Sequence, residues 1–343
     1  MMTNDCTFPN YTITPEQTQH AEYRARLSEE IEAGNSLSLT DLRERAIEHP
    51  IIVEYKTRIA GGDSSCATYE SWLDRLLTPF APRHRCLSLG AGQGRIEKHF
   101  VEKRLCGSFE ALDVCFEEIS GTQTNSEGVS TNFMDLNFSR LKPDTYDLIL
   151  CHGVLHHLIN LEFLFDQINA ALKPDGVVLI YEYVGERQWQ FSDERMTMLR
   201  RQFPQVRFKN FPKWAVEGFE SVRSDELPRL IHSVFGSATV HSRFFGGIYF
   251  PFLTCSTVKH DSLLEKVVAL DDEFSASGKI APCYHVGLYG KTNNKAPRAT
   301  PWTDEMLAGR LRRDFPTSEN LSRTLRRSSL GPLLRKIKRT VVR

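Results

Sequence analysis

The sequence predicts an α/β protein built around a doubly wound, mainly parallel sheet. Between residues 85 and 183, short apolar runs alternate with segments of helical spacing, as in βα units around a parallel sheet. The run at 177–183 is apolar enough for a strand buried on both faces. The 343 residues are 41% hydrophobic and 25% charged, which suits one large domain with appendages. No window contains the ~18 consecutive apolar residues of a membrane-spanning helix.

The order of elements divides the chain into three parts. We expect a helical N-terminal cap over 1–80, an α/β domain over 81–290, and a linker with a basic, partly amphipathic tail over 291–343. The capping box at 14–17, with Pro15 at the first helical position, predicts the first helix of the cap. Helices in the cap are expected at 14–33, 40–49, from 49 to about 56, and at 69–77.

Hydrophobic patterning then places the elements of the α/β domain in order. Strands are expected at 86–89, 111–114, 130–134, 146–151, 177–183, 239–245 and 283–289. Helices are expected at 93–105, 161–172 and 193–203, and residues 204–228 have the composition of loops.

The net charge of zero conceals a basic C-terminal segment. Residues 291–343 contain 14 Lys and Arg but 4 Asp and Glu, which leaves 29 basic and 39 acidic residues before them. Four apolar residues, Leu333, Leu334, Ile337 and Val341, share one helical face of this tail. The pattern suits weak contact with an anionic membrane surface or a solvated, disordered tail. Nucleic acid is not an expected partner, because no aromatic residues for base stacking alternate with the charges.

Two further features indicate the compartment. The N-terminus, MMTNDCTFPN, lacks the basic and apolar regions of a signal peptide, and the eight cysteines form no C-x-x-C pair. We therefore expect a reduced, cytoplasmic protein, peripheral to the inner membrane if the tail binds lipid.

A glycine-rich loop, LGAGQG at 89–94, joins an expected strand to an expected helix. Glycines there allow a tight turn and a close approach of the backbone to a ligand. The dinucleotide fingerprint G-x-G-x-x-G fails at Arg95, and no G-K-[ST] sequence marks a phosphate-binding loop. The remaining form, G-x-G-x-G, suits a ligand that combines an amino acid with a nucleoside.

Two carboxylates follow the next two strands. Asp113 lies 23 residues after Gly90, where an acidic side chain can accept hydrogen bonds from both ribose hydroxyls. Asp135 can accept from an adenine amine, while Val114 or Leu136 covers the ring. The alternatives are a helix cap at Asp113 and a simple turn at Asp135.

Five blocks in this order, LSLGAGQG, ALDV, FMDL, YDLILCHGVLHHL and ALKPDGVVLIYEY, resemble the class I S-adenosylmethionine-dependent methyltransferases. The resemblance implies a Rossmann-like seven-stranded sheet whose last strand is antiparallel, and residues 285–290 are similar to that strand. It implies S-adenosyl-L-methionine as cofactor. The residues that would hold it are Gly90, Ala91, Gly92, Gln93 and Gly94 for methionine, Asp113 and Val114 for ribose, Asp135 and Leu136 for adenine, and Cys151 and His152 beside the sulfonium.

A narrower resemblance involves residues 49–61, 182–190 and 221–225. These segments look like methyltransferase-domain proteins encoded in bacterial polysaccharide and related biosynthetic clusters. No metal-ligand set of the catechol-methylating type is evident, so no metal is expected.

Catalytic candidates lie at the ends of the fourth and fifth strands, at the carboxyl edge where open α/β sheets bind ligands. A hydroxyl acceptor needs a base, and Glu182 is the preferred candidate, followed by His156 and His157. Acceptor-binding candidates are Tyr181, Trp189 and Arg223. The alternatives are a solvated strand end for Glu182, a structural histidine pair, a core or lid position for Trp189, and a surface ion pair for Arg223.

We therefore expect a methyltransferase that acts on oxygen in a small-molecule or carbohydrate-type (glycan) acceptor. Two alternatives stay open: transfer to nucleic acid or protein, and a non-catalytic S-adenosylmethionine-binding module that regulates a partner.

Overall fold

The computed structural model describes residues 19–36, 48–61, 68, 70–115, 127–209, 218–256, 258 and 260–295. The capping box at 14–17, nearly all of the helix expected at 40–49, and the tail after residue 295 lie outside these ranges. Within the described residues, no helix is both long and apolar enough to cross a membrane.

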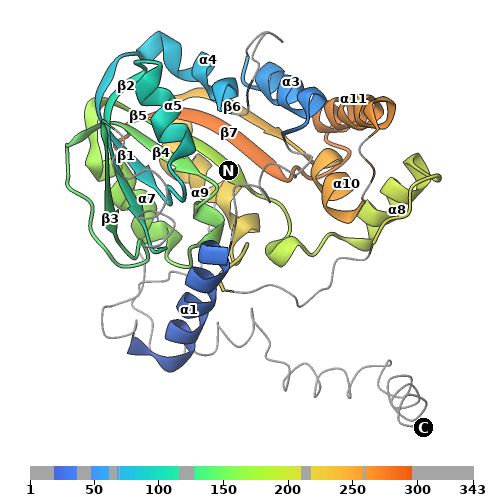
Figure 1. Cartoon of the computed structure of the whole chain (residues 1–343), viewed down its shortest axis with the longest axis horizontal. Coiled ribbons are helices and arrows are strands. Elements are labelled where there is room, and N and C mark those ends of the chain that lie inside the picture. The colour runs from blue at the N-terminus through green and yellow to red at the C-terminus, as the bar shows by residue number, and fades with distance from the viewer. Residues whose placement is uncertain are drawn as a thin grey trace, which may run out of the picture.

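A seven-stranded sheet forms the centre of the protein (Figure 1). Its order is β3-β2-β1-β4-β5-β7-β6. Strand β7 runs antiparallel to both of its neighbours, and the other pairs are parallel. The expected doubly wound sheet with an antiparallel last strand is therefore confirmed. The strands are β1 (Arg83–Leu89), β2 (Cys106–Asp113), β3 (Val129–Phe133), β4 (Tyr146–His152), β5 (Leu172–Tyr183), β6 (Thr239–Phe245) and β7 (Tyr284–Gly290).

The register brings the candidate residues to one edge of the sheet. Leu89 pairs with Leu112 on one side and with Cys151 on the other. The carboxyl ends of β1, β2 and β4 are therefore level, and the residues that follow them meet in space. Strand β5 continues this edge, because His152 pairs with Tyr181.

Helices cover both faces of the sheet, since each face buries its own apolar cluster. One face carries α3 (Pro50–Ile59), η3 (Ser71–Leu73), α4 (Asp74–Leu77), η4 (Thr78–Phe80), α5 (Arg95–Glu102), α8 (Asp193–Gln202), α10 (Tyr249–Cys255) and α11 (Asp261–Ser277). The other carries α7 (Leu161–Ala171) and α9 (Leu227–Phe235). Short 3-10 turns complete the chain at η5 (Leu155–His157), η6 (Arg187–Trp189), η7 (Ser224–Glu226) and η8 (Gly236–Ala238).

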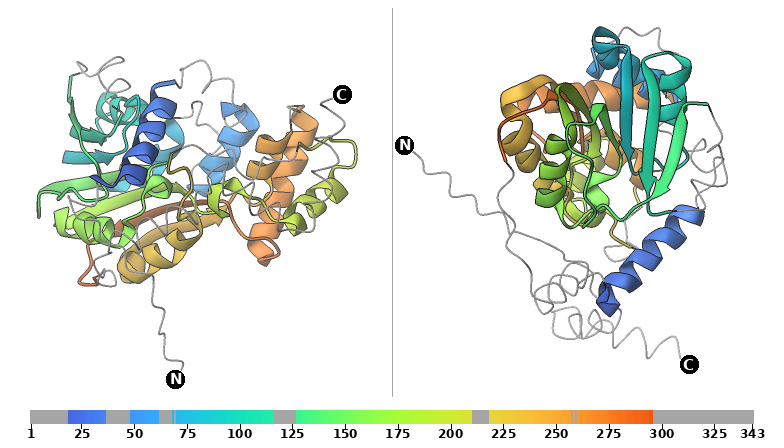
Figure 2. Two further views of the ribbon diagram at one scale, coloured as in Figure 1. Left: turned by 90° about the horizontal axis from the view of Figure 1, so that it is seen from below. Right: turned by 90° about the vertical axis from the view of Figure 1, so that its left-hand side faces the viewer.

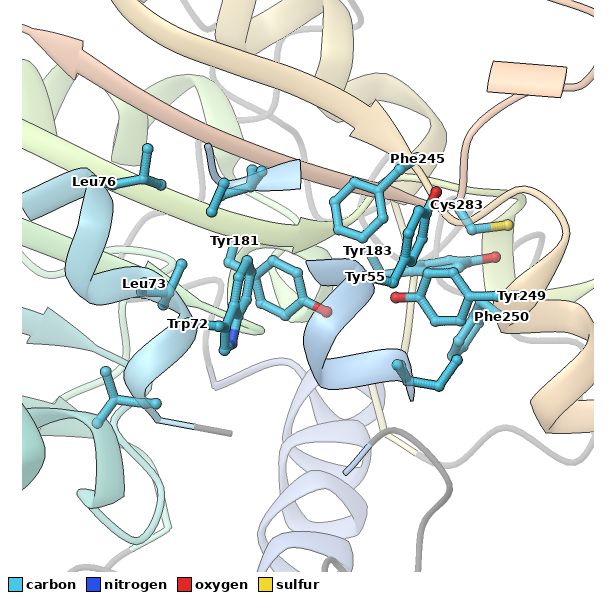
Figure 3. Close-up of a cluster of buried hydrophobic side chains, with 14 of the residues drawn as sticks. Tyr55, Trp72, Leu73, Leu76, Tyr181, Tyr183, Phe245, Tyr249, Phe250 and Cys283 are labelled. Carbon is cyan, nitrogen blue, oxygen red and sulfur yellow. The ribbon is translucent and has the colours of Figure 1, made fainter. Parts of the chain in front are cut away.

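The helical residues before β1 do not form one separate cap. Tyr55 of α3 and Trp72 of η3 are buried in the same cluster as the β5 side chains (Figure 3). The boundary expected at residue 80 therefore does not separate two hydrophobic cores. Helix α1 (Ala21–Ser36) alone lies apart from both helical layers (Figures 1 and 2). Its Tyr23 reaches Asp135, just after β3, so α1 lies at the carboxyl edge.

Helix starts follow local capping. His49 caps α3 with its side chain, and Pro50 occupies the first helical position. Ser192 caps α8 in the same way. The sequence did not predict α9, α10 or α11. Pro228 and Pro251 interrupt the helical period in α9 and α10.

Candidate functional site

The glycine loop after β1 forms one wall of a cavity of about 270 Å³ at the carboxyl edge. Gly90, Gly92 and Gly94 all have positive φ, at 62°, 50° and 66°. A Cβ built on Gly90 would lie 2.3 Å from Cγ2 of Val154, in the loop after β4. Glycine is therefore required at residue 90 by both its backbone conformation and its neighbour.

Asp113 ties this loop to the end of β2. Its Oδ2 accepts a hydrogen bond of 2.8 Å from the backbone N–H of Gly92, and its Oδ1 accepts one of 2.8 Å from Cys115. A carboxylate has about four lone-pair positions, so these two bonds leave room for two hydroxyl donors. Asp113 and Val114 both line the cavity.

Asp135 lies on the opposite wall, under α1. Its Oδ2 accepts a hydrogen bond of 2.7 Å from the hydroxyl of Tyr23, and its Oδ1 accepts one of 2.9 Å from the N–H of Asn137. Burial raises the pKa of Asp135. Met134 and Leu136 supply apolar surface beside it. Tyr23 is not predicted from the sequence, because its contact with Asp135 joins residues 112 positions apart.

Glu182 anchors the turn after β4. Its Oε1 accepts hydrogen bonds of 2.8 Å from the backbone N–H groups of Val154 and Leu155, and its Oε2 lies 2.7 Å from Nδ1 of His156. The side chain is fully buried and does not line the cavity. The prediction that Glu182 is the base is therefore corrected: its carboxylate holds η5 and orients His156.

The second histidine faces the cavity. Nδ1 of His157 lies 2.6 Å from Oε1 of Glu30, on α1, and Nε2 lies 3.7 Å from Oε2 of Glu220. Nε2 of His156 lies 3.4 Å from Oε1 of the same Glu220. Burial alone would lower the pKa of His157, but Glu30 and Glu220 outweigh it and raise the pKa to about 10.

His157, Glu30 and Glu220 all line the cavity. Neither glutamate is predicted as a site residue from the sequence. The adjacent histidines were the signal that could have prompted a search for acidic partners.

On the other side of β5, Tyr181 belongs to an aromatic core. Its ring centroid lies 4.9 Å from that of Trp72, edge to face, and stacks 5.2 Å from that of Tyr284. Figure 3 shows Tyr181 among other buried rings, and Tyr181 does not line the cavity. The prediction that Tyr181 binds the acceptor is wrong for this reason. Cys151 is likewise buried in the core beneath α7 and does not line the cavity.

Lys56 of α3 lies in the same aromatic region. Its Nζ is 5.7 Å from the ring centroid of Trp72 and 5.5 Å from that of Tyr181, in cation–π geometry. Burial lowers the pKa of Lys56 from 10.5 to about 7, against the attraction of Glu48. Burial, with Lys56 nearby, also lowers the pKa of His152 to about 4, so that His152 is neutral.

The prediction that Arg223 binds the acceptor is also corrected. Its guanidinium is fully buried and donates to Glu162 at 2.7 and 2.8 Å and to Glu226 at 2.6 Å. It also donates to the carbonyl of Ile159 at 2.8 Å. Arg223 therefore fastens the loop before α7 to η7 and is not exposed to an acceptor. Trp189 lies in η6, and its side chain is outside the part of the structure described.

Taken by position, the sequence-predicted residues fall into two groups. One group lines the cavity: Gly90, Gly92, Asp113, Val114, Asp135, Leu136 and His157. The other lies at the same edge without lining it: Ala91, Gln93, Gly94, His152 and His156. The assigned roles of both groups remain predictions.

The cavity fits an adenosyl group. Asp113 retains acceptor capacity for two hydroxyls, and Asp135 can accept from an amine. Val114, Met134 and Leu136 provide an apolar surface for a flat ring between them.

Comparisons with known proteins show what the chain is similar to. The family described as "Methyltransferase domain" matches residues 64–233. The mitochondrial arginine-hydroxylase NDUFAF5 of Homo sapiens is 27% identical over 104 residues. That match covers 30% of each protein, so the chain spans about 30% of the length of this curated relative.

Solved structures with a similar chain course include an S-adenosylmethionine-dependent methyltransferase from Mesorhizobium loti. It is 17% identical, with a TM-score of 0.40, and the match covers 64% of this chain and 97% of that one. The YcgJ protein of Bacillus subtilis is 16% identical, with a TM-score of 0.39 and coverages of 66% and 98%. A phosphoethanolamine N-methyltransferase of Haemonchus contortus, in complex with S-adenosylhomocysteine, is 15% identical, with a TM-score of 0.38 and coverages of 75% and 61%.

Proposed function

The chain belongs to the class I S-adenosylmethionine-dependent methyltransferases, and from this premise we propose that it methylates a hydroxyl oxygen of a small or carbohydrate-type acceptor. One observation carries the proposal. The cavity that contains Asp113 and Asp135 also contains a histidine–carboxylate cluster suited to take a proton. S-Adenosylmethionine supplies a methyl group that is already activated on a sulfonium.

The cofactor would bind at the carboxyl edge of the sheet. Asp113 would accept from the ribose hydroxyls and Asp135 from the adenine amine, with Leu136 against the ring. The positive φ angles of Gly90 and Gly92 allow the backbone to approach the ligand closely.

The cluster of His156, His157 and Glu220 would remove the proton of the acceptor hydroxyl. A hydroxyl acceptor must lose its proton as it is methylated, whereas a sulfonium methyl needs little other assistance. Glu220 faces the cavity with Nε2 of His156 3.4 Å behind it, and Glu182 fixes the far side of that imidazole. The proton of the acceptor would pass to this cluster.

Helix α1 and the segment at 218–220 would exclude water from the cavity. Phe219 packs against Tyr23 with ring centroids 5.3 Å apart, and its backbone N–H donates to Glu30 at 2.8 Å. These two segments close the cavity on the side away from the sheet. Enclosure of this kind protects the aligned reactants from solvent.

The test is incubation of the full chain with methyl-labelled S-adenosylmethionine and fractionated cell extract. We expect label in a small-molecule or glycan fraction, on oxygen, as a base-stable methyl ether; a base-labile methyl ester would show a carboxylate acceptor and contradict the proposal. Glu220→Gln should lower turnover while the affinity for S-adenosylhomocysteine stays the same. The matched control is Glu102→Gln, at an exposed side chain on α5. Label in protein or nucleic acid, or binding without any turnover, would contradict the proposal.

A further inference from the structure

The histidine–carboxylate cluster has the geometry of a metal site. His156, His157 and Glu220 each offer one ligand atom, and these atoms lie within 4.8 Å of one another. The two imidazoles are successive in η5, with centroids 4.2 Å apart. Their Nε2 atoms face the same carboxylate, at 3.4 Å and 3.7 Å from its two oxygens.

These separations match ligands better than hydrogen-bond partners. A strong N–H···O⁻ bond between charged groups spans about 2.7–2.9 Å. Nitrogen and oxygen ligands each lie about 2.0–2.2 Å from a zinc-sized cation, and at a tetrahedral angle they are about 3.4 Å apart. The Nε2 atoms of His156 and His157 are thus spaced from Glu220 as two ligands around a shared cation would be.

The far side of each imidazole faces another carboxylate. Nδ1 of His156 lies 2.7 Å from Glu182, and Nδ1 of His157 lies 2.6 Å from Glu30. Metal-binding histidines almost always turn their other nitrogen to such a partner, which fixes the ring and raises its basicity. Both partners are fixed in turn, Glu182 by two backbone N–H groups of the η5 turn and Glu30 by that of Phe219.

The charges of the surrounding side chains also favour a bound cation. Three carboxylates, Glu30, Glu182 and Glu220, surround two imidazoles in a region that is largely buried. A buried excess of negative charge is costly unless a cation is present.

We propose that His156, His157 and Glu220 bind one divalent transition-metal cation at the wall of the cavity. Two imidazoles and one carboxylate suit zinc, iron, cobalt or manganese, and leave a coordination position open towards the cavity. No metal is expected from the sequence, since no ligand set of the catechol-methylating type is evident. Glu220 is remote from the histidines along the chain, and no ligand-spacing motif connects them.

The metal site stands without the proposed reaction, but its use there rests on the proposed function. An acceptor oxygen that fills the open position would have its hydroxyl pKa lowered by the cation. With the cation bound, His156, His157 and Glu220 would act as its ligands rather than as the base, and the proton of the acceptor would leave to solvent as the methyl group is transferred.

The experiment measures metal binding by the full chain. The protein is stripped with a chelator and titrated with Zn²⁺ and with Co²⁺, with calorimetry for affinity and visible absorption for Co²⁺ geometry. We expect one cation per chain and the absorption of nitrogen and oxygen ligands. His157→Ala and Glu220→Gln should each weaken binding about 10-fold or more. Glu182→Gln should weaken it by about 10–100-fold through loss of the partner of His156.

Controls separate metal binding from folding and from the cofactor site. His84→Ala removes an exposed imidazole on β1 and should leave the affinity unchanged. Circular dichroism melting checks that each variant is folded, and Glu220→Gln keeps the shape of the side chain. Titration with S-adenosylhomocysteine, without metal, reports the cofactor cavity by itself.

Three results would overturn the proposal: no binding by the stripped protein, affinity unchanged in folded His157→Ala and Glu220→Gln, or a Co²⁺–thiolate charge-transfer band. Each would leave the affinity for S-adenosylhomocysteine, and therefore the proposed function, to be judged separately.

Discussion

Replacement of Asp113 by asparagine removes one acceptor at the centre of the cavity while keeping the shape of the side chain. In the structure both oxygens accept from backbone N–H groups, those of Gly92 and Cys115. An amide has one oxygen, so its NH₂ group must face one of these donors. Loss of a hydrogen bond to a charged group costs about 1.5–3 kcal/mol, and we expect Asp113→Asn to lower the free energy of unfolding by about that amount.

The same change should weaken cofactor binding. A ribose hydroxyl that donates to the carboxylate would lose a bond of about 1.5–3 kcal/mol, which raises the dissociation constant about 10–150-fold. Isothermal titration calorimetry with S-adenosylhomocysteine measures this change, and urea unfolding measures stability.

Asp147→Asn provides the matched control. Asp147 accepts from the backbone N–H of Arg85 at 2.9 Å and pairs with Lys173, at the opposite end of β4. It should lose stability without losing affinity. Equal affinity of Asp113→Asn and the wild type, with both folded, would refute the assignment of Asp113 to the ribose.

Three more changes test other parts of the account. Gly90→Ala should lower the free energy of unfolding in urea more than Gly61→Ala does, because the added Cβ at residue 90 would meet Val154. A Cβ at residue 61 has nothing within 4 Å and adds only about 1–2 kcal/mol of backbone strain. Equal losses of stability in the two variants would contradict the close contact. Lys56 loses its proton near pH 7 in the folded chain but near 10.5 when unfolded, so stability should rise with pH across that window, by at most about 4 kcal/mol. Lys56→Met should flatten the profile, and an unchanged slope in chemical unfolding between pH 7 and 10 would show that the slope has another source. Arg223→Met should lower the free energy of unfolding by about 3–5 kcal/mol, because it leaves buried carboxylates unpaired. The folded variant should keep the KM of the wild type for the acceptor. A raised KM at unchanged stability would show that Arg223 binds the acceptor after all.

The sequence was sufficient for features that depend on local pattern. Apolar runs located all seven strands, and the glycine loop and Asp113 were correctly placed at the ends of β1 and β2. These features follow from periodicity, from glycine conformation and from the rule that parallel strands end at one edge.

The environment of each polar side chain could not be read in the same way. Glu182 and Arg223 have the residue types of a base and of an acceptor-binding group, but the hydrogen bonds of both side chains go to residues from distant segments. Glu182 is held by the turn after β4, and Arg223 by Glu162, 61 residues earlier in the chain. Tyr23 and Glu30 reach the cavity only because α1 folds back over the sheet edge. Contacts of this kind depend on tertiary packing, which leaves no periodic trace in the sequence.

We propose that the cavity between the glycine loop and Asp135 binds the adenosyl group of the cofactor. A crystal structure of the full chain with S-adenosylhomocysteine tests it most directly. We predict electron density for the ribose within hydrogen-bond distance of Asp113 and for the adenine beside Leu136 and Asp135. Ligand density elsewhere on the protein, with this cavity filled by α1 side chains, would contradict the account.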